Sequence, residues 1–391
     1  MDYIYLDNDA STRVDDEVVE AMIPFFTKDY GMASSDFGHT YGVKCRRAIE
    51  EARAIIAEKI NAEPEEVLFT SGVAESNNTA IRGMGMGKNG NMVTSTIEQK
   101  TVLNVMKFLE DHKRVKRAVV GVDNEGFVDF EELERVITKD TRVVSIQHAN
   151  HEIGTIQDIA RIGRLCSEKG IPFHTDASHS FLKTDIDVER MNIDLMTISA
   201  HNIYGPKGVG ALYVRKGIEI TPLLIGGGEQ RGLRSGLEDV PAIVGFAKAV
   251  EIYNEKDNAK MRVLRDYLID GLLGIEDTHL NGPKGKKRLC NNANITFKYV
   301  EGESILLHLD MRGIAVTTGS ACFSRELTPS HVIHAIGGSH ADAHGSVRFS
   351  LSKYNNRQEM DYTVKNVREV VEKLREISPV GGGKTKRGTK D

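Results

Sequence analysis

The sequence predicts an α/β fold, with a large domain built on a mainly parallel sheet and a smaller α+β domain after it. Three observations lead to this prediction. The chain has 391 residues, of which 40% are hydrophobic, enough for one large domain and a smaller one. Short β-rich runs alternate with stretches of helical period from about residue 65 to 215. After the glycine triplet at 226–228 this alternation stops.

Seven β-rich runs define the predicted large domain, at 67–70, 92–95, 118–122, 143–147, 172–174, 195–199 and 210–214. Mostly helical stretches separate them, so we expect helices to cover both faces of the sheet. Ligands of such sheets bind outside the carboxyl ends of the strands. The residues that follow each run are therefore the first candidates for a functional site.

The later part of the chain predicts a long helix at 240–273, strands at 293–297, 314–317 and 347–351, and helices at 304–311 and 359–376. We expect four segments. They are an N-terminal arm at 1–15 that belongs to the small domain, a large domain at 16–255, a small domain at 256–378 and a disordered tail at 379–391.

Composition excludes several function classes. The formal net charge of −5 gives no basic field for nucleic acid. No apolar stretch approaches the length of a membrane span, and the first residues do not resemble a signal peptide. The four cysteines, at 45, 166, 290 and 322, are widely spaced without a CxxC pair, which fits a reducing compartment. We therefore expect a soluble, cytoplasmic protein.

Polar motifs follow several of the predicted strands. Ser71-Gly72 leads from a strand into a helix, and such a helix N-terminus binds anions, phosphate especially. His174 and Asp176 share one face of a strand, and a buried carboxylate needs a cationic group or a ring N–H as partner. Arg348 lies within a strand and needs a carboxylate in turn.

With these motifs the chain resembles the cysteine desulfurases of the NifS/IscS type, class V aminotransferases with the aspartate-aminotransferase fold. The matching segments run in order along nearly the whole chain: 5–8, 69–72, 75–78, 148–150, 152–154, 204–208, 234–236, 319–322 and 348–350. The resemblance implies pyridoxal phosphate (PLP) as cofactor. It also implies a homodimer in which residues 234–236 reach toward the partner.

The positions that hold PLP in this family are largely altered here. The family's Schiff-base lysine is Asn202, and an amide can neither form an imine nor abstract the substrate α-proton. Five other positions that contact PLP in the family also differ. Ala74, beside Val73, stands where the family has a phosphate-binding threonine, and Gln99 stands where it has the histidine that stacks on the ring. His151 replaces an asparagine, His179 a glutamine and Leu237 a threonine. Asp176, Ser199, His201 and Arg348 keep the family's residue types, Arg348 at the position that binds the substrate carboxylate.

Cys322 lies in a run of small polar residues, Thr317-Thr318-Gly319-Ser320-Ala321-Cys322-Phe323-Ser324. Such surroundings favour an exposed, reactive thiol over a buried one. In the family this cysteine receives sulfur as a persulfide and delivers it to a scaffold protein. A thiolate can also bind iron, so Cys322 could share a [2Fe-2S] cluster with that scaffold.

Three functions are compatible with these residues. The first is a desulfurase-like protein of iron–sulfur cluster assembly that lacks normal PLP catalysis and presents Cys322 to a U-type scaffold. The second is an active PLP-dependent cysteine desulfurase, with Lys100 or another amine in place of the missing lysine. The third is a metal-binding protein that uses His151 and His179 beside His174 and His201.

Overall fold

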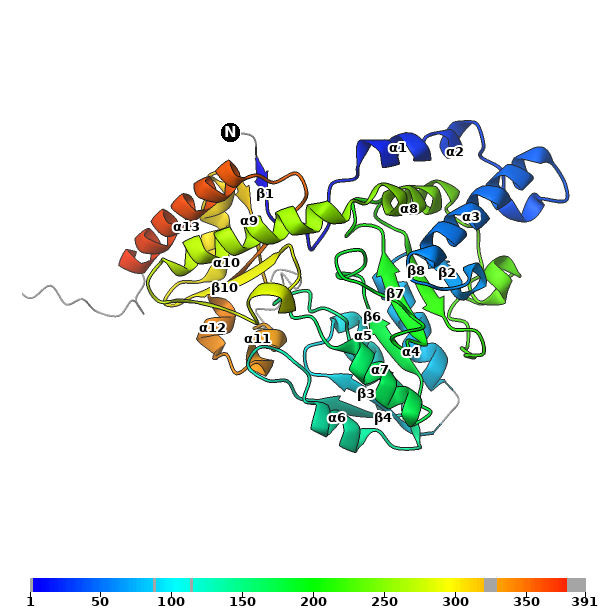
Figure 1. Cartoon of the computed structure of the whole chain (residues 1–391), viewed down its shortest axis with the longest axis horizontal. Helices are drawn as coiled ribbons and strands as arrows, with labels where there is room; N and C mark the ends of the chain where they lie inside the picture. The colour runs from blue at the N-terminus through cyan, green and yellow to red at the C-terminus, as the bar shows by residue number, and fades with distance from the viewer. Residues whose placement is uncertain (1–2, 87–88, 113–114, 320–328, 378–391) are drawn as a thin grey trace, which may run out of the picture.

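The computed structural model describes residues 3–86, 89–112, 115–319 and 329–377. Two sheets with separate hydrophobic cores dominate the molecule (Figure 1). Cys322 and the predicted tail at 379–391 lie outside the described residues. The domain boundaries predicted from the sequence stay a proposal.

The larger sheet has seven strands in the order β2-β8-β7-β6-β5-β3-β4. All pairs are parallel except those of β8, which runs antiparallel to β2 and β7. The fold class predicted from the sequence is thereby confirmed. The strands are β2 (Val67–Thr70), β3 (Asn91–Ser95), β4 (Lys116–Val120), β5 (Thr141–Ser145), β6 (Phe173–Asp176), β7 (Leu195–Ser199) and β8 (Gly210–Val214). β4 and β5 begin two residues earlier than predicted.

Helices cover both faces of this sheet, because successive strand side chains point to opposite faces. Leu68 packs with α4 (Val73–Gly85) and α5 (Lys100–Asp111), whereas its neighbour Phe69 packs in the core on the other face. That other face is covered by α3 (Thr40–Glu58), α6 (Phe130–Val136), α7 (Ile159–Glu168) and α8 (Val240–Ile252). The short helices α1 (Asp16–Met22) and α2 (Pro24–Thr27) pack along α8.

The second sheet has the order β12-β13-β10-β9, with β9 at Thr278–Leu280, β10 at Asn292–Phe297, β12 at Thr317–Thr318 and β13 at Ser346–Ser350. Its core packs against α9 (Glu255–Leu273), α10 (Gly302–Asp310) and α13 (Arg357–Ile377). The short helices α11 (His331–Ala335) and α12 (His340–His344) follow β12 in the chain.

The N-terminal arm forms a separate two-stranded sheet beside this second sheet. β1 (Ile4–Tyr5) pairs in parallel with β11 (Ile314–Ala315), and Ile4 and Leu6 are buried in the core formed by α9, α10 and α13. Figure 1 shows β1 beside α9 and α13. The arm then crosses to the large sheet, where the backbone N–H of Thr12 donates to the carbonyl of His201. It thereby spans the site described below.

Two predicted elements are wrong in detail. The helix predicted at 240–273 is two helices, α8 and α9, because the side chain of Asn254 accepts the Lys256 N–H and starts a new helix. The strand predicted at 314–317 divides into β11, which pairs with β1, and β12, which pairs with β13. Within the described residues no helix is long and apolar enough to cross a membrane.

Candidate functional site

Asp176 closes β6 and lies at the centre of the candidate site. It is 2% exposed, and its Oδ1 accepts hydrogen bonds from the Ser178 backbone N–H (3.0 Å) and from the Ser178 hydroxyl (2.6 Å). Its Oδ2 accepts one from Asn77 Nδ2 at 2.8 Å, which ties the strand end to α4. The turn after β6 therefore holds this carboxylate in one orientation. It lies at the carboxyl end of a strand, where ligands of such sheets are expected to bind.

His174 lies below Asp176 on the same strand and is fully buried. Its Nδ1 is 2.8 Å from the Ser145 hydroxyl and its Nε2 is 3.1 Å from the Thr197 hydroxyl. Burial lowers the pKa of His174 to about 4, although the negative charge of Asp176 opposes the change. The ring is thus neutral at physiological pH and belongs to the support of the site.

Asn202 follows β7 and is fully buried. Its Nδ2 donates to the Ser178 carbonyl at 3.1 Å and to the Ser199 hydroxyl at 3.4 Å, so the predicted pair Ser199 and Asn202 lies together. Its Oδ1 has no hydrogen-bond partner among the described residues. The neighbouring His201 has a pKa lowered to about 4, by burial and by the charges of His179, Lys183 and Lys207.

The start of α4 forms another wall of the site. α4 begins at Val73 after Gly72, whose φ of +132° is a conformation that glycine adopts readily. The Ser71 backbone N–H donates to Glu75 Oε2 at 2.8 Å, and Glu75 Oε1 is 3.0 Å from Arg234 Nε. The Glu75 side chain therefore already accepts a backbone N–H that an anion could bind before α4. In addition, Ala74 has no hydroxyl that could bind a phosphate.

Gln99 and Leu237 occupy different environments. Gln99 caps the start of α5, and its Nε2 is 3.4 Å from the Ser178 hydroxyl, so it lies beside Asp176. Leu237 is 66% exposed and lines a separate cavity of about 190 Å³ with Phe25 and Tyr30. The structure therefore brings Gln99 into the site but leaves the Leu237 side chain outside it in a single chain.

His151 and His179 form a second group with Arg348. The two rings lie 5.8 Å apart between centroids. Arg348 Nη1 donates to the His151 carbonyl at 2.9 Å, and Nη2 forms an ion pair with Asp7 Oδ1 at 2.8 Å. Burial and the positive charges of His179 and Arg348 lower the pKa of His151 well below its usual value.

Two residues of this group escape sequence reasoning, Asp9 and Lys183. Asp9 is 2% exposed and its Oδ1 lies 3.9 Å from His179 Nδ1. Lys183 is 6% exposed, and its Nζ has no hydrogen-bond partner among the described residues. In the sequence, only the acidic run Asp7-Asn8-Asp9 points to this group. The run becomes buried because the N-terminal arm passes between the two sheets, which the sequence alone does not indicate.

The segment that contains Cys322 begins and ends at this site. A Cβ added at Gly319 would collide with the Glu152 carboxylate and lie 3.0 Å from the Ser330 side chain. Ser330 in turn caps α11, and His331 Nε2 is 3.0 Å from the Glu98 carbonyl. Both described ends of the segment thus lie against the loops of the large sheet. The other cysteines, Cys45, Cys166 and Cys290, are buried.

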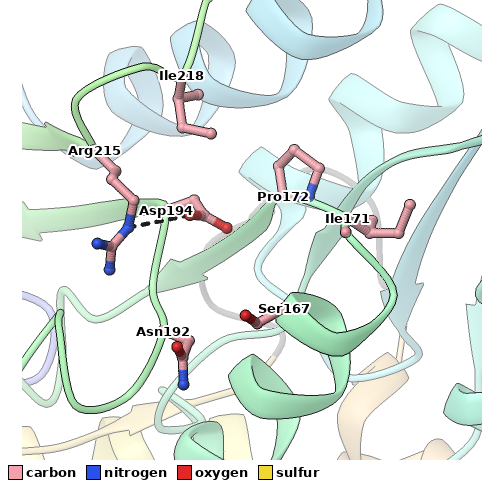
Figure 2. Close-up of a pocket in the computed structure, with 8 residues that line it drawn as sticks. Ser167, Ile171, Pro172, Asn192, Asp194, Arg215 and Ile218 are labelled. Atoms are coloured by element: carbon pink, nitrogen blue, oxygen red, sulfur yellow. Dashed lines mark ion pairs between the residues drawn. The ribbon is translucent and has the colours of Figure 1, made fainter.

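The remaining candidates contribute less. Lys100 and Lys207 are exposed. No group of three or more His, Cys, Asp or Glu side chains within the described part of the chain could hold a metal ion. A cavity of about 320 Å³ between Ser167 and Arg215 lies at the amino-terminal ends of β6 and β7, away from the candidate site at their carboxyl ends (Figure 2). It holds the Arg215–Asp194 ion pair and none of the predicted site residues.

The site fits PLP in part only. Asp176, with its fixed orientation, is a suitable partner for a ring N–H, and Arg348 is a buried cation beside His151. The amide of Asn202, however, cannot bond covalently to the aldehyde of the cofactor, and it is already hydrogen-bonded to Ser178. The residues present therefore do not fit a covalently held PLP.

Comparison with known proteins identifies the family. The family model for class-V aminotransferases matches residues 4–363. The chain is 46% identical over 382 residues to cysteine desulfurase IscS 1 of Archaeoglobus fulgidus, covering 96% of this chain and 99% of that protein. It is 45% identical over 383 residues to cysteine desulfurase IscS of Dictyoglomus turgidum, covering 96% of each.

Solved structures agree with this. A NifS-like protein superposes with a TM-score of 0.88 at 37% identity, covering 95% of this chain and all of the other (100%). SspA in complex with cysteine gives a TM-score of 0.81 at 38% identity, covering 90% of this chain and 100% of the other. The names of the curated relatives favour the predicted active desulfurase over the predicted form without PLP catalysis. The family also implies PLP as its cofactor. This chain belongs to the class-V aminotransferase family and, within it, to the cysteine desulfurases.

Proposed function

We propose that this protein acts in sulfur transfer for iron–sulfur cluster assembly, presenting Cys322 to a U-type scaffold without covalent PLP catalysis. Asn202 is the observation that carries the proposal. Its side chain is fully buried and donates to Ser178 and Ser199, so no amine stands at the position where the family places its lysine. An amide nitrogen is neither a nucleophile toward an aldehyde nor a base for an α-proton.

Cys322 would then receive sulfur from a donor other than PLP-bound cysteine, namely a persulfide whose outer sulfur the thiolate attacks and whose own thiolate leaves, or would bind iron itself. A thiolate on a segment whose ends lie beside Glu152 and Ser330 could reach either this pocket or a docked partner. A [2Fe-2S] cluster shared between Cys322 and the scaffold is the corresponding intermediate. We further propose a cytoplasmic homodimer with no nucleic-acid or membrane partner.

The second candidate is an active PLP-dependent cysteine desulfurase, which the names of the relatives favour directly. It requires another amine. Two lysines are candidates for that amine. Lys100 begins α5 but is exposed, whereas Lys183 is buried and lies close enough to His201 that its charge lowers the pKa of His201. The third candidate, a metal protein built on His151 and His179, stays a prediction and has no set of three ligands among the described residues.

A spectrum and a product assay separate the first two candidates. The purified protein, loaded with PLP and dialysed, is expected to show no visible absorbance band that borohydride removes, and to release no alanine from cysteine. The Asn202→Lys variant should regain covalent PLP but little activity, since Ala74, Gln99, His151 and His179 remain. Release of alanine by the unmodified protein would establish the second candidate in place of the first.

A cluster assay tests the role of Cys322. The Cys322→Ser variant should bind the scaffold as the parent does, yet fail to support cluster formation from inorganic sulfide and iron. Cys166→Ser, a change at a buried position in α7, serves as the control and should leave cluster formation intact. Equal cluster formation with Cys322→Ser would contradict a role of Cys322 as an iron ligand, since inorganic sulfide bypasses the sulfur-carrier route.

A further inference from the structure

Four histidines lie between β12 and β13 in the chain, at 331, 334, 340 and 344. His331 stands apart from the others, because its Nε2 lies 3.0 Å from the Glu98 carbonyl. The His340 ring is 6.1 Å from that of His334 and 4.5 Å from that of His344, between ring centroids. His334 belongs to α11 and the other two to α12, and Figure 1 shows these helices side by side. Three imidazoles therefore gather on two adjacent helices.

The backbone of α12 places two of these rings together. His340 and His344 are the first and last residues of this helix. Side chains four positions apart lie on the same face of a helix, and two histidines with this spacing can bind one metal ion. A capping box fixes the short helix, since the Ser339 hydroxyl accepts the Asp342 N–H and the Asp342 carboxylate accepts the Ser339 N–H. The pair therefore stands on an anchored stretch of backbone.

Both rings line a cavity of about 860 Å³, larger than the two cavities described above. Two carboxylates, Glu301 and Asp342, line it as well and outnumber the ammonium of Lys298, so the local charge favours a cation. Within the described ranges, ring contacts are the interactions that His340 and His344 make, and no hydrogen bond or ion pair engages their nitrogens. These nitrogens are therefore available to a ligand that enters the cavity.

We propose that His340 and His344 bind one divalent ion of a first-row transition metal and leave its other coordination positions open to the cavity. Imidazole is a good ligand for copper, nickel and zinc, and affinity is highest for copper(II) in this series. Two protein ligands fill only part of the coordination sphere, in agreement with the absence of a three-residue metal group among the described residues. Water, or a donor atom of a molecule in the cavity, takes the remaining positions. The proposal does not depend on the role of Cys322.

Copper(II) titration followed by electron paramagnetic resonance tests the site, because the spectrum reports the imidazole nitrogens on the ion. The full-length protein carries Cys322→Ser, so that this thiol does not compete for the metal. One Cu²⁺ per chain should bind through two imidazole nitrogens. His340→Gln or His344→Gln should weaken binding about tenfold or more, at least the loss caused by removing a residue that only supports a metal ligand. Nickel and zinc should compete for the site, whereas Mg²⁺, which prefers oxygen ligands, should not.

His334→Gln is the matched control. Its ring is the neighbour of His340, but its Nδ1 donates to the Gly338 carbonyl at 3.1 Å, and the variant should bind Cu²⁺ as the Cys322→Ser parent does. A parent spectrum without two imidazole nitrogens would overturn the proposal, even if the other variants fail to fold. Unchanged affinity in both His340→Gln and His344→Gln, or an equal loss with His334→Gln, would also overturn it. Displacement of Cu²⁺ by Mg²⁺ would assign the ion to carboxylates instead of the histidine pair.

Discussion

The side chain of Asn202 donates a hydrogen bond to the carbonyl oxygen of Ser178 across 3.1 Å. Both residues are fully buried, one after β7 and the other after β6. The amide therefore joins two neighbouring loops at the position where the family has its reactive lysine. At this position the hydrogen bond from Asn202 to Ser178 stands where the family has a reactive amine.

Replacement of Asn202 by alanine should lower the free energy of unfolding by about 1–2 kcal/mol, because the buried Ser178 carbonyl loses a donor. Urea unfolding at pH 7 measures this change. Asn124→Ala, on the surface, is the control and should change stability by about 0.5 kcal/mol or less. Equal stability of the two variants would show that the contact contributes nothing.

His174 should make the protein sensitive to acid. Its folded pKa of about 4 lies below the usual 6.5, so the unfolded chain binds the proton first. Stability from this group is therefore complete above pH 6.5 and is lost as the pH falls toward 4.

His174→Gln should reduce the slope of unfolding free energy against pH in that window, by up to about 1.4 kcal/mol per pH unit. The comparison is made by urea unfolding between pH 6.5 and 4.5. His112→Gln, at an exposed site, should leave the slope unchanged. A slope equal to that of the unmodified protein would mean that His174 does not stay neutral in the fold.

Glu98 should make the folded protein less stable as the pH rises, the opposite of the effect of His174. It is fully buried, and burial raises its pKa from 4.5 to about 8, against the hydrogen bonds from the Gln147 N–H and the Ser95 hydroxyl. The folded state keeps a proton that the unfolded state releases above pH 4.5. Its contribution to stability is therefore lost as the pH rises toward 8.

Glu98→Gln should flatten the decline of unfolding free energy between pH 6.5 and 8, by up to about 1.4 kcal/mol per pH unit. The opposing contribution of His174 has ended in that range. Glu131→Gln, in the exposed first turn of α6, is the control. An unchanged decline in Glu98→Gln would place the folded pKa near its ordinary value.

Gly210→Ala should destabilise the sheet by about 1–3 kcal/mol. Its added Cβ would lie 2.7 Å from the Ile198 carbonyl oxygen and 2.9 Å from Gly72 Cα, so the turn before α4 would have to move. Gly228→Ala, where nothing lies within 4 Å, should be nearly neutral. Thermal unfolding of both variants provides the comparison, and equal midpoints would contradict the predicted contact.

The large sheet could be predicted from the sequence because its signals are local. Each β-rich run, such as 195–199, carries its own pattern, and Asp176 and Asn202 follow directly from the strands that place them. The break at Asn254 was missed because the residues around it keep a helical period on both sides. The environment of Asp9 was missed because its partners, Asn291 and Asn292, lie 282 and 283 residues away.

The arm that carries Asp7 and Asp9 has a consequence for synthesis of the chain. Asp7 leaves the ribosome 341 residues before its partner Arg348. The large sheet, which ends at Val214, can form well before that. Domains generally fold as they emerge, N-terminal parts first. The charged arm must therefore wait in solvent until Arg348 has been translated, so the Asp7–Arg348 ion pair forms long after the large sheet can form.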